Sequence, residues 1–340
     1  MNGLLTAFDE VHTKYPSYCG RVYAFGMALS NACAVVVVKF VDKRVSFGTV
    51  GSLQGAISFA LSVALYSRTQ QAWPSKPLAS TALFIRGFIG GFLGIMFIMA
   101  VKLVPAQKNI VLMNTAPIWV VILSIYFLND YPNKLILAMV ASIFLGVILL
   151  IYPSLIIPSS WLSSPQVGSD QDIPIYYYIF PLLAGFSGAC VTIFLKVFSK
   201  DLTVYSNSIA YFIFLAFWMG LASTLFTVDQ DSLRPSIKDC LFIFLFGFAC
   251  VMFQLNLTLA TRYEKRMSIV AMIGNSQILI AYVMDYFLLG NRVELINAIG
   301  GLIVAGSTIT IAFTKESISK PAEPAATPQT VGGETQPHPK

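Results

Sequence analysis

The sequence predicts an all-α membrane protein with ten transmembrane helices, arranged as two inverted repeats of five. Three observations lead to this prediction: the composition, ten separate apolar segments, and an internal repeat at a nearly fixed offset. Of the 340 residues, 56% are hydrophobic and only 11% are charged, whereas a soluble domain carries about 25% charged residues. This composition excludes a soluble fold, and the abundance of aromatic residues excludes a disordered chain.

The ten segments were located by length and by the breaks between them. A transmembrane helix needs about 20 mostly apolar residues, and charge clusters and Gly/Pro-rich stretches mark where such helices end. The first break is Asp42-Lys43-Arg44, and later ones lie at 73–77, 129–133 and 262–266. The predicted segments are 20–39, 46–66, 82–101, 107–127, 134–152, 176–197, 205–226, 239–260, 267–289 and 293–313.

These segments divide the chain into five parts. Residues 1–19 form an N-terminal segment without an apolar signal sequence, and 20–152 hold the first five helices. A polar loop at 153–175 separates them from the second five helices at 176–314. The tail at 315–340 is rich in Pro, Ala, Thr and Gly, which is typical of disorder. The short links between helices 3 and 4, 4 and 5, and 9 and 10 predict that each pair packs together.

An internal repeat is the most informative feature of the sequence. When residues 84–151 are laid on 244–311 without gaps, at an offset of 160, the run Tyr-Phe-Leu at 126–128 meets the same run at 286–288. Gly87 meets Gly247 and Gly146 meets Gly306. The first span matches the sixth at an offset of 157. Because five is an odd number, the second copy enters the bilayer from the opposite side, so the repeats are inverted.

The repeat and two local motifs resemble a known family. The 5+5 plan, the segment Asn114-Thr115-Ala116-Pro117 in the fourth span and the Gly-rich run at 300–306 are similar to the EamA-like family of the drug/metabolite transporter superfamily. The resemblance implies a secondary active transporter of small polar organic metabolites that works by alternating access of the two repeats. A nucleotide-sugar antiporter of the Golgi or endoplasmic reticulum is one alternative. A non-transporting multispan scaffold is another.

Candidate substrate-binding residues follow from the same resemblance, which implies a central cavity between helices 3, 4, 8 and 9. Asn114 and Thr115 lie near the middle of the fourth span, and the offset of 160 carries the second of them onto Asn275 in the ninth. Gln277 is the symmetric counterpart of Pro117. Buried amides and hydroxyls need hydrogen-bonding partners, which a polar substrate can supply. Bonds between helices are the alternative role for these side chains.

Four charged residues complete the candidate set. Arg86 lies inside the third span and Asp285 inside the ninth, where ionisable groups are functional hypotheses by default. The guanidinium of Arg86 suits a carboxylate or phosphate, although it could also reach the lipid headgroups. Asp285 is a candidate for proton coupling, or for pairing with a lysine. Lys102 and Lys108 flank the link between the third and fourth spans and are predicted at the mouth of the cavity.

The sequence also limits the other functional classes. It contains no GxSxG, HExxH or P-loop motif and no Cys or His spacing typical of a metal site, so neither an enzyme nor a cofactor is predicted. The net charge of +6 is attributed to the cytoplasmic membrane face rather than to nucleic acid. Counting Lys and Arg by loop predicts that both termini are cytoplasmic. The predicted partners are a small-molecule substrate and the lipid bilayer; a coupling proton, a homodimer and the choice between plasma membrane and endomembranes stay open.

Overall fold

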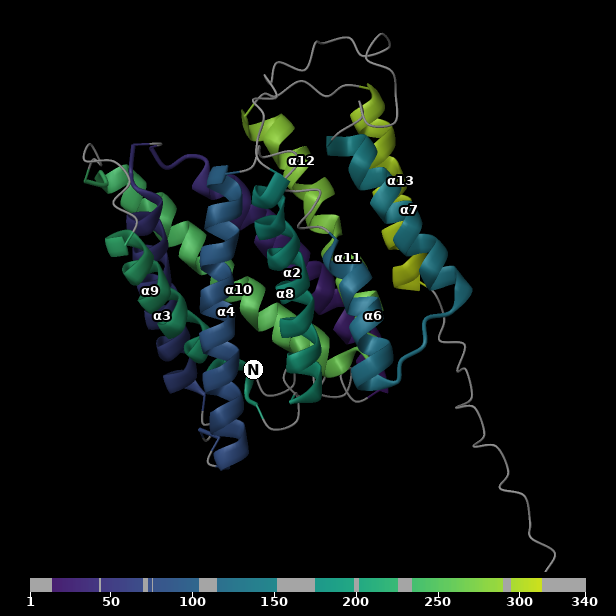
Figure 1. The fold of residues 1–340 in the computed structure, drawn as a ribbon, viewed down its shortest axis with the longest axis horizontal. Coiled ribbons are helices and arrows are strands. Elements are labelled where there is room, and N and C mark those ends of the chain that lie inside the picture. Colours follow the sequence, from purple (N-terminus) through teal and green to yellow (C-terminus); the bar gives the residue numbers. More distant parts are fainter. Residues whose placement is uncertain are drawn as a thin grey trace, which may run out of the picture.

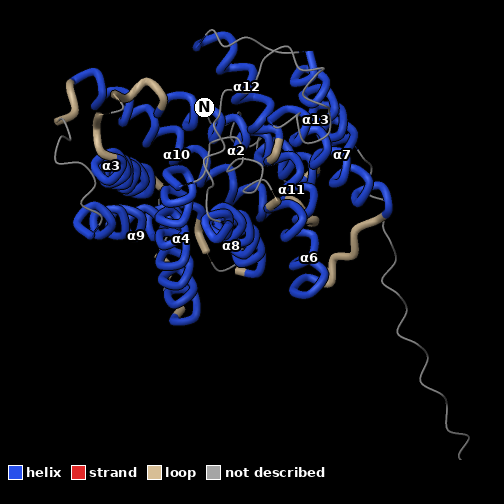
Figure 2. The backbone as a smooth tube through the Cα atoms, turned by 45° about the horizontal axis from the view of Figure 1, so that its top comes forward, coloured by secondary structure: helices blue, strands red, loops and turns tan. Residues whose placement is uncertain are grey.

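The computed structural model describes residues 14–42, 44–69, 73–74, 76–103, 115–151, 175–198, 202–225, 234–289 and 295–313. Within these ranges every regular element is helical, and Figure 2 shows no strand among them. The prediction of an all-α protein is therefore confirmed for the described part of the chain. The candidate residues Asn114 and Lys108 lie outside these ranges, as do the loop at 153–174 and the tail from residue 314.

Most of the predicted segments correspond to one helix each. The helices are α2 (Pro16–Val38), α3 (Phe47–Arg68), α4 (Pro77–Leu103), α6 (Ala116–Leu128), α7 (Lys134–Ile151), η3 (Ile175–Tyr178), α8 (Ile179–Val197), α9 (Val204–Leu225), α10 (Ile237–Tyr263), α11 (Met267–Gly274), α12 (Ser276–Leu289) and α13 (Leu295–Phe313).

The ninth predicted segment differs from the expectation of one continuous helix. The chain leaves regular α geometry at Asn275, between α11 and α12. The amide of Asn275 still reaches the carbonyl of Ala271 at 3.1 Å, but the next turn tightens, since the amide of Ile278 bonds the carbonyl of Asn275 at 3.1 Å. Such three-residue turns are usual at helix termini. The break thus lies at a residue predicted for the binding site.

Seven helical stretches of the described chain are long and apolar enough to cross a membrane, and α11 with α12 counts as one of them. Three further apolar helices are shorter: Ala116–Leu128, Lys134–Leu149 and Ile299–Thr310. The chain is therefore an integral multi-pass membrane protein, while the count of ten spans remains a prediction.

Helices from the two ends of the sequence pack on one another (Figure 1). The closest pairs are α2 with α10, α3 with α9, α4 with α9, and α7 with α13. The expected neighbours α4 and α6, and α6 and α7, are not among the closely packed pairs of the described chain, whereas α12 and α13 do pack together. Connection length alone therefore does not set the neighbours in the described part of the chain, where the closest packing joins helices remote in sequence.

The outer surface of the bundle is apolar. Phe313, Leu302 and Val22 are each at least 70% exposed, and apolar patches of this kind mark lipid contact in a membrane protein. The repeated Tyr-Phe-Leu runs lie at the C-terminal ends of α6 and α12, and Tyr126 is 79% and Phe287 76% exposed. Aromatic residues at helix ends are typical of the interfaces between membrane and water.

The interior centres on α11. All of its residues except Ala271 are buried, and it packs against α2, α6, α13 and α7. Its apolar side chains, including Met272 and Ile273, join Ile143 and Val304 in one buried cluster. The break at Asn275 therefore lies in the middle of the bundle, between helices from both ends of the chain.

Candidate functional site

Gln277, a residue predicted for the substrate-binding site, forms a hydrogen bond between two helices inside the bundle. Asn31 of α2 donates from Nδ2 to Oε1 of Gln277 in α12, at 2.6 Å. Bonds of this kind between membrane helices contribute about 0.6 kcal/mol on average. Asn31 was missed by the sequence analysis, although an amide in the second half of a predicted span was a visible signal.

Asn275 is buried beside the first turn of α6. It lines a cavity of about 10 Å³ together with Pro117, Ile118, Val140, Ile143, Phe144 and Met272. A cavity of this size admits about one water molecule and no solute. The predicted approach of the fourth and ninth spans is visible here, since Pro117 and Asn275 share the cavity. Thr115 stands at the N-cap of α6 and is partly buried, whereas Gln277 faces α2 instead.

Arg86 lies further from the start of its helix than the predicted span implies. The predicted span began at residue 82, but α4 begins at Pro77, which makes Arg86 its tenth residue. Its side chain is 2% exposed and donates from Nη2 to Oε1 of Gln254 in α10, at 3.3 Å. The guanidinium carbon lies 4.9 Å from the ring centre of Tyr211 in α9. Among the residues that the structure describes, its Nε and Nη1 have no hydrogen-bonding partner. A route to the headgroups is therefore absent in this conformation.

Further polar residues continue from this position along α10. Asn207 of α9 donates from Nδ2 to the hydroxyl of Thr258 at 2.8 Å, and that hydroxyl donates to the carbonyl of Gln254 at 2.8 Å. Tyr211, Gln254 and Asn207 were all missed. Each of these three residues is a polar side chain within a predicted apolar span, and this was the available signal. Only the fold shows that α9 and α10 bring these side chains toward Arg86.

Four candidate residues cannot be placed as side chains. Lys102 lies in α4 and Asp285 in α12, but the side chains of both fall outside the described part of the structure. Lys108 is outside the described residues altogether, as is Asn114. The predicted cavity mouth and the predicted role of Asp285 therefore stay predictions.

One end of the bundle carries a charged network that joins helices from both halves of the chain. Arg21 at the start of α2 pairs with Glu264 after α10, with Nε 3.1 Å from Oε2, and the two side chains are 7% and 0% exposed. Lys196 at the end of α8 donates to the carbonyls of Thr261 and Glu264. Gly20 permits the approach, because a Cβ there would lie 2.4 Å from the amide nitrogen of Glu264.

A second ion pair lies at the same end. Arg266 approaches Asp130, which follows α6, with 3.8 Å between Nε and Oδ1. Burial raises the pKa of the Asp130 carboxyl, and the nearby Arg266 and Lys196 oppose that rise. Burial likewise raises the pKa of Glu264, and Arg21 opposes it. The link between α6 and α7 is thereby tied to the link between α10 and α11.

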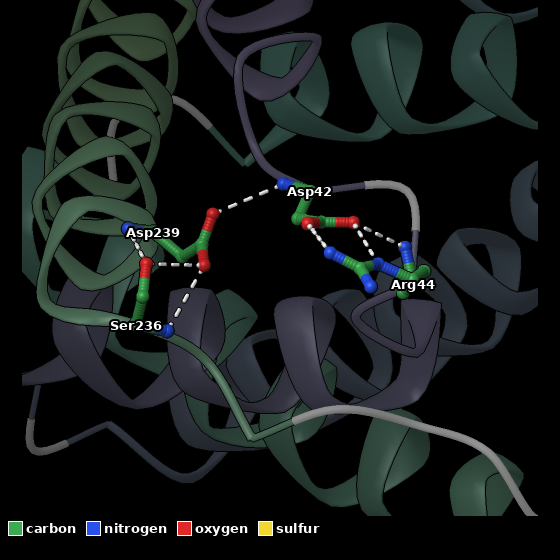
Figure 3. Close-up of polar contacts among 4 residues, drawn as sticks. All are labelled: Asp42, Arg44, Ser236 and Asp239. Atoms are coloured by element: carbon green, nitrogen blue, oxygen red, sulfur yellow. Dashed lines mark hydrogen bonds and ion pairs between the residues drawn. The ribbon is translucent and has the colours of Figure 1, made fainter.

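The opposite end is closed by a different contact, shown in Figure 3. Asp239 and Ser236 form a capping box at the start of α10, and the amide of Asp42 donates to Oδ1 of Asp239 at 3.0 Å. Asp42 follows α2 and turns its carboxylate to Arg44, at 2.9 Å. The guanidinium of Arg44 lowers the pKa of Asp42 to about 2. Contacts between the two halves thus close both ends of the bundle.

The described residues contain no group of three or more His, Cys, Asp or Glu side chains placed to hold a metal ion. The cysteines within the described ranges are free thiols.

The comparisons with known proteins give a match to one family model over part of the chain and a likeness in fold. Residues 19–152 match the model of the EamA-like transporter family. One solved crystal structure has a TM-score of 0.67 and 13% sequence identity, over 86% of this chain and 97% of the other. At that identity the likeness concerns the fold alone. No curated protein matches the chain.

Proposed function

We propose that this chain, whose residues 19–152 match the model of the EamA-like transporter family, belongs to the drug/metabolite transporter superfamily and is a secondary active transporter of small polar organic metabolites. The mechanism proposed is alternating access of two inverted five-helix repeats. In such an architecture, two similar halves rock around a site near the middle of the membrane.

The observation that carries the proposal is a packing pattern that is preserved when the two halves are exchanged. Numbering the spans from one to ten, span 1 packs on span 8 (α2 on α10) as span 6 packs on span 3 (α8 on α4). Span 3 packs on span 7 (α4 on α9) as span 8 packs on span 2 (α10 on α3). Spans 2 and 7 pack on each other, and so do spans 5 and 10. Exchanging the two halves leaves each of these pairs unchanged.

The helix bounds support the same repeat. An offset of 157 carries Phe47–Arg68 of α3 onto Val204–Leu225, which are the bounds of α9. An offset of 160 carries Pro77–Leu103 of α4 onto Ile237–Tyr263, which are the bounds of α10. The counterpart of α11 would be 107–114, outside the described residues.

Matched glycines have matched neighbours. A Cβ on Gly87 of α4 would lie 2.5 Å from the carbonyl oxygen of Ala210 and from the ring of Phe214 in α9. A Cβ on Gly247 of α10 would lie 3.1 Å from Ile57 in α3. The offset of 157 carries Ile57 onto Phe214. The two equivalent glycines therefore allow the close approach of two equivalent helices, α9 and α3.

The structure corresponds to a closed arrangement in this mechanism. The charged network around Glu264 ties the halves at one end, and the contact between Asp42 and Asp239 ties them at the other. The buried residues Arg86 and Asn275 and the partly buried Gln277 lie between these ends. We propose that Thr115 and Asn114 line the same site, that Asp285 takes part in proton coupling, and that Lys102 and Lys108 mark its mouth.

The experiment also addresses two alternative functions. Arg86 would suit the anionic part of a nucleotide sugar in an antiporter of the Golgi or endoplasmic reticulum. A scaffold without transport would need the buried amides only for packing. The closed, repeat-based arrangement favours a carrier, because a scaffold has no use for two interchangeable halves.

Transport is tested in vesicles that contain the purified full chain, supplied with pooled labelled metabolites in the presence and absence of a proton gradient. Asn275→Leu and Gln277→Leu should each lower uptake of the transported solute about tenfold or more, because a substrate partner is removed. Membrane insertion should be unchanged, since one interhelical bond contributes little to stability.

The matched control is Thr192→Leu, which also removes a polar group from a helix. Thr192 is partly exposed, and its hydroxyl donates to the carbonyl of Gly188 in its own helix. Normal uptake by all three variants would contradict the proposed site. The absence of uptake by the unmodified chain for every pooled metabolite would contradict transport.

A further inference from the structure

The guanidinium of Arg86 is a buried cation without a buried anion. Within the described residues, no carboxylate lies within ion-pair distance of it, and its only hydrogen bond goes to the neutral amide of Gln254. Arginine keeps its charge in proteins. A buried charge that lacks an ionic partner is costly, so protein interiors pair such charges or bind ligands with them.

The depth of Arg86 makes the missing anion more significant. It lies nine residues from the start of α4, and Gln254 lies nine residues from the end of α10. At a rise of 1.5 Å per residue, each is about 14 Å from those helix ends. The hydrocarbon core is about 30 Å thick, so a pair at this distance from the helix ends lies well inside a membrane-spanning bundle.

The local packing is built to accommodate the guanidinium. A Cβ at position 90 would lie 2.2 Å from Nη1 of Arg86 and 2.9 Å from the ring of Tyr211, so only glycine leaves room for both. The Tyr211 ring supplies a cation–π contact at 4.9 Å. The cation is thus held by a ring and one amide, with Nε and Nη1 left without partners.

The position also lies where the proposed transport cycle would open the bundle. Arg86 belongs to α4, whereas Tyr211 and Gln254 belong to α9 and α10 of the second half. Movement of one half against the other would therefore expose the guanidinium to solute. Its planar fork can donate two parallel hydrogen bonds to a carboxylate or a phosphate.

We propose that Arg86, positioned by Gly90 and Tyr211, is an anion-binding subsite, and that the transported solute carries a carboxylate or phosphate group. This inference rests on the proposed function for its role in transport. Binding of the anion itself does not depend on transport and can be measured alone.

The test measures the thermal stability of the purified full chain in detergent while a probe is titrated at constant ionic strength. The probes are succinate, inorganic phosphate and the neutral analogue succinamide. Succinate, phosphate or both should raise the melting temperature saturably, and succinamide should not. Arg86→Gln should abolish this rise, and Arg86→Lys should weaken the apparent affinity about tenfold or more by losing the fork.

Two further variants separate binding from folding. Gly90→Ala should displace the guanidinium and weaken the anion effect, whereas Gly188→Ala, whose Cβ would meet nothing within 4 Å, should leave it unchanged. Without probe, Arg86→Gln should melt no lower than the unmodified chain, because it removes an uncompensated charge. A structural arginine would instead give a clear loss of stability.

Several outcomes would overturn the subsite. These are the absence of stabilisation by either anion, an equal effect of succinamide, or an unchanged effect in both Arg86→Gln and Gly90→Ala. If the anions stabilise the chain but vesicles take up no metabolite, the subsite stands and transport fails. If uptake proceeds equally well in Arg86→Gln, transport stands and the subsite fails.

Discussion

At the level of single residues, the buried carboxylate of Glu264 allows a direct prediction about stability. It is completely buried, faces Arg21, and lies near Lys196 and Arg266. Removing one member of a buried ion pair typically costs about 3–5 kcal/mol, whereas replacing both by apolar residues costs far less. Arg21→Met should therefore destabilise the protein more than the double variant Arg21→Met with Glu264→Leu. Unfolding in mixed micelles measures both, and equal losses would show that the pair is not coupled.

The same residue predicts a pH dependence. Because burial raises the pKa of Glu264 above 4.5 in the folded state, the folded protein binds this proton more tightly than the unfolded one. Its contribution to stability is then full below pH 4.5 and is lost as the pH rises through the raised pKa. Glu264→Gln should flatten this part of the curve of melting temperature against pH. A curve identical to that of the unmodified chain would refute the assignment.

At the level of elements, the approach of α4 to α9 depends on glycine. A Cβ at Gly87 would meet a backbone oxygen at 2.5 Å, and backbone cannot move aside as a side chain can. Gly87→Ala should therefore cost about 1–3 kcal/mol by overpacking. Gly306→Ala is the control, since nothing lies within 4 Å of its Cβ. Both changes improve helix propensity equally, so similar stabilities in unfolding measurements would argue against the close packing.

At the level of the whole molecule, the proposed arrangement of two inverted halves predicts a topology. Cys240 is exposed at the start of α10, and Cys19 lies in the first turn of α2. With the N-terminus in the cytoplasm, a membrane-impermeant maleimide should label a variant that keeps only Cys240 from outside the cytoplasm. A variant that keeps only Cys19 should need permeabilisation. The reverse pattern would contradict the predicted orientation, in which the end that holds Arg21 and Glu264 faces the cytoplasm.

The sequence by itself determined the membrane class and the approximate helices, and it predicted the repeat. These depend on composition and on runs of apolar residues, which are local properties of the chain. It also placed Arg86, Asn275 and Gln277 inside the bilayer, because polar residues stand out within apolar spans.

Only the tertiary structure decided which side chains meet. It paired Gln277 with Asn31, placed Tyr211 and Gln254 around Arg86, and brought Glu264 to Arg21, across 243 positions of sequence in the last case. Helices in lipid choose neighbours by close packing and by hydrogen bonding between faces. Those contacts join remote residues, so spacing along the chain does not encode them, and short links misled the expectation that α4 packs on α6.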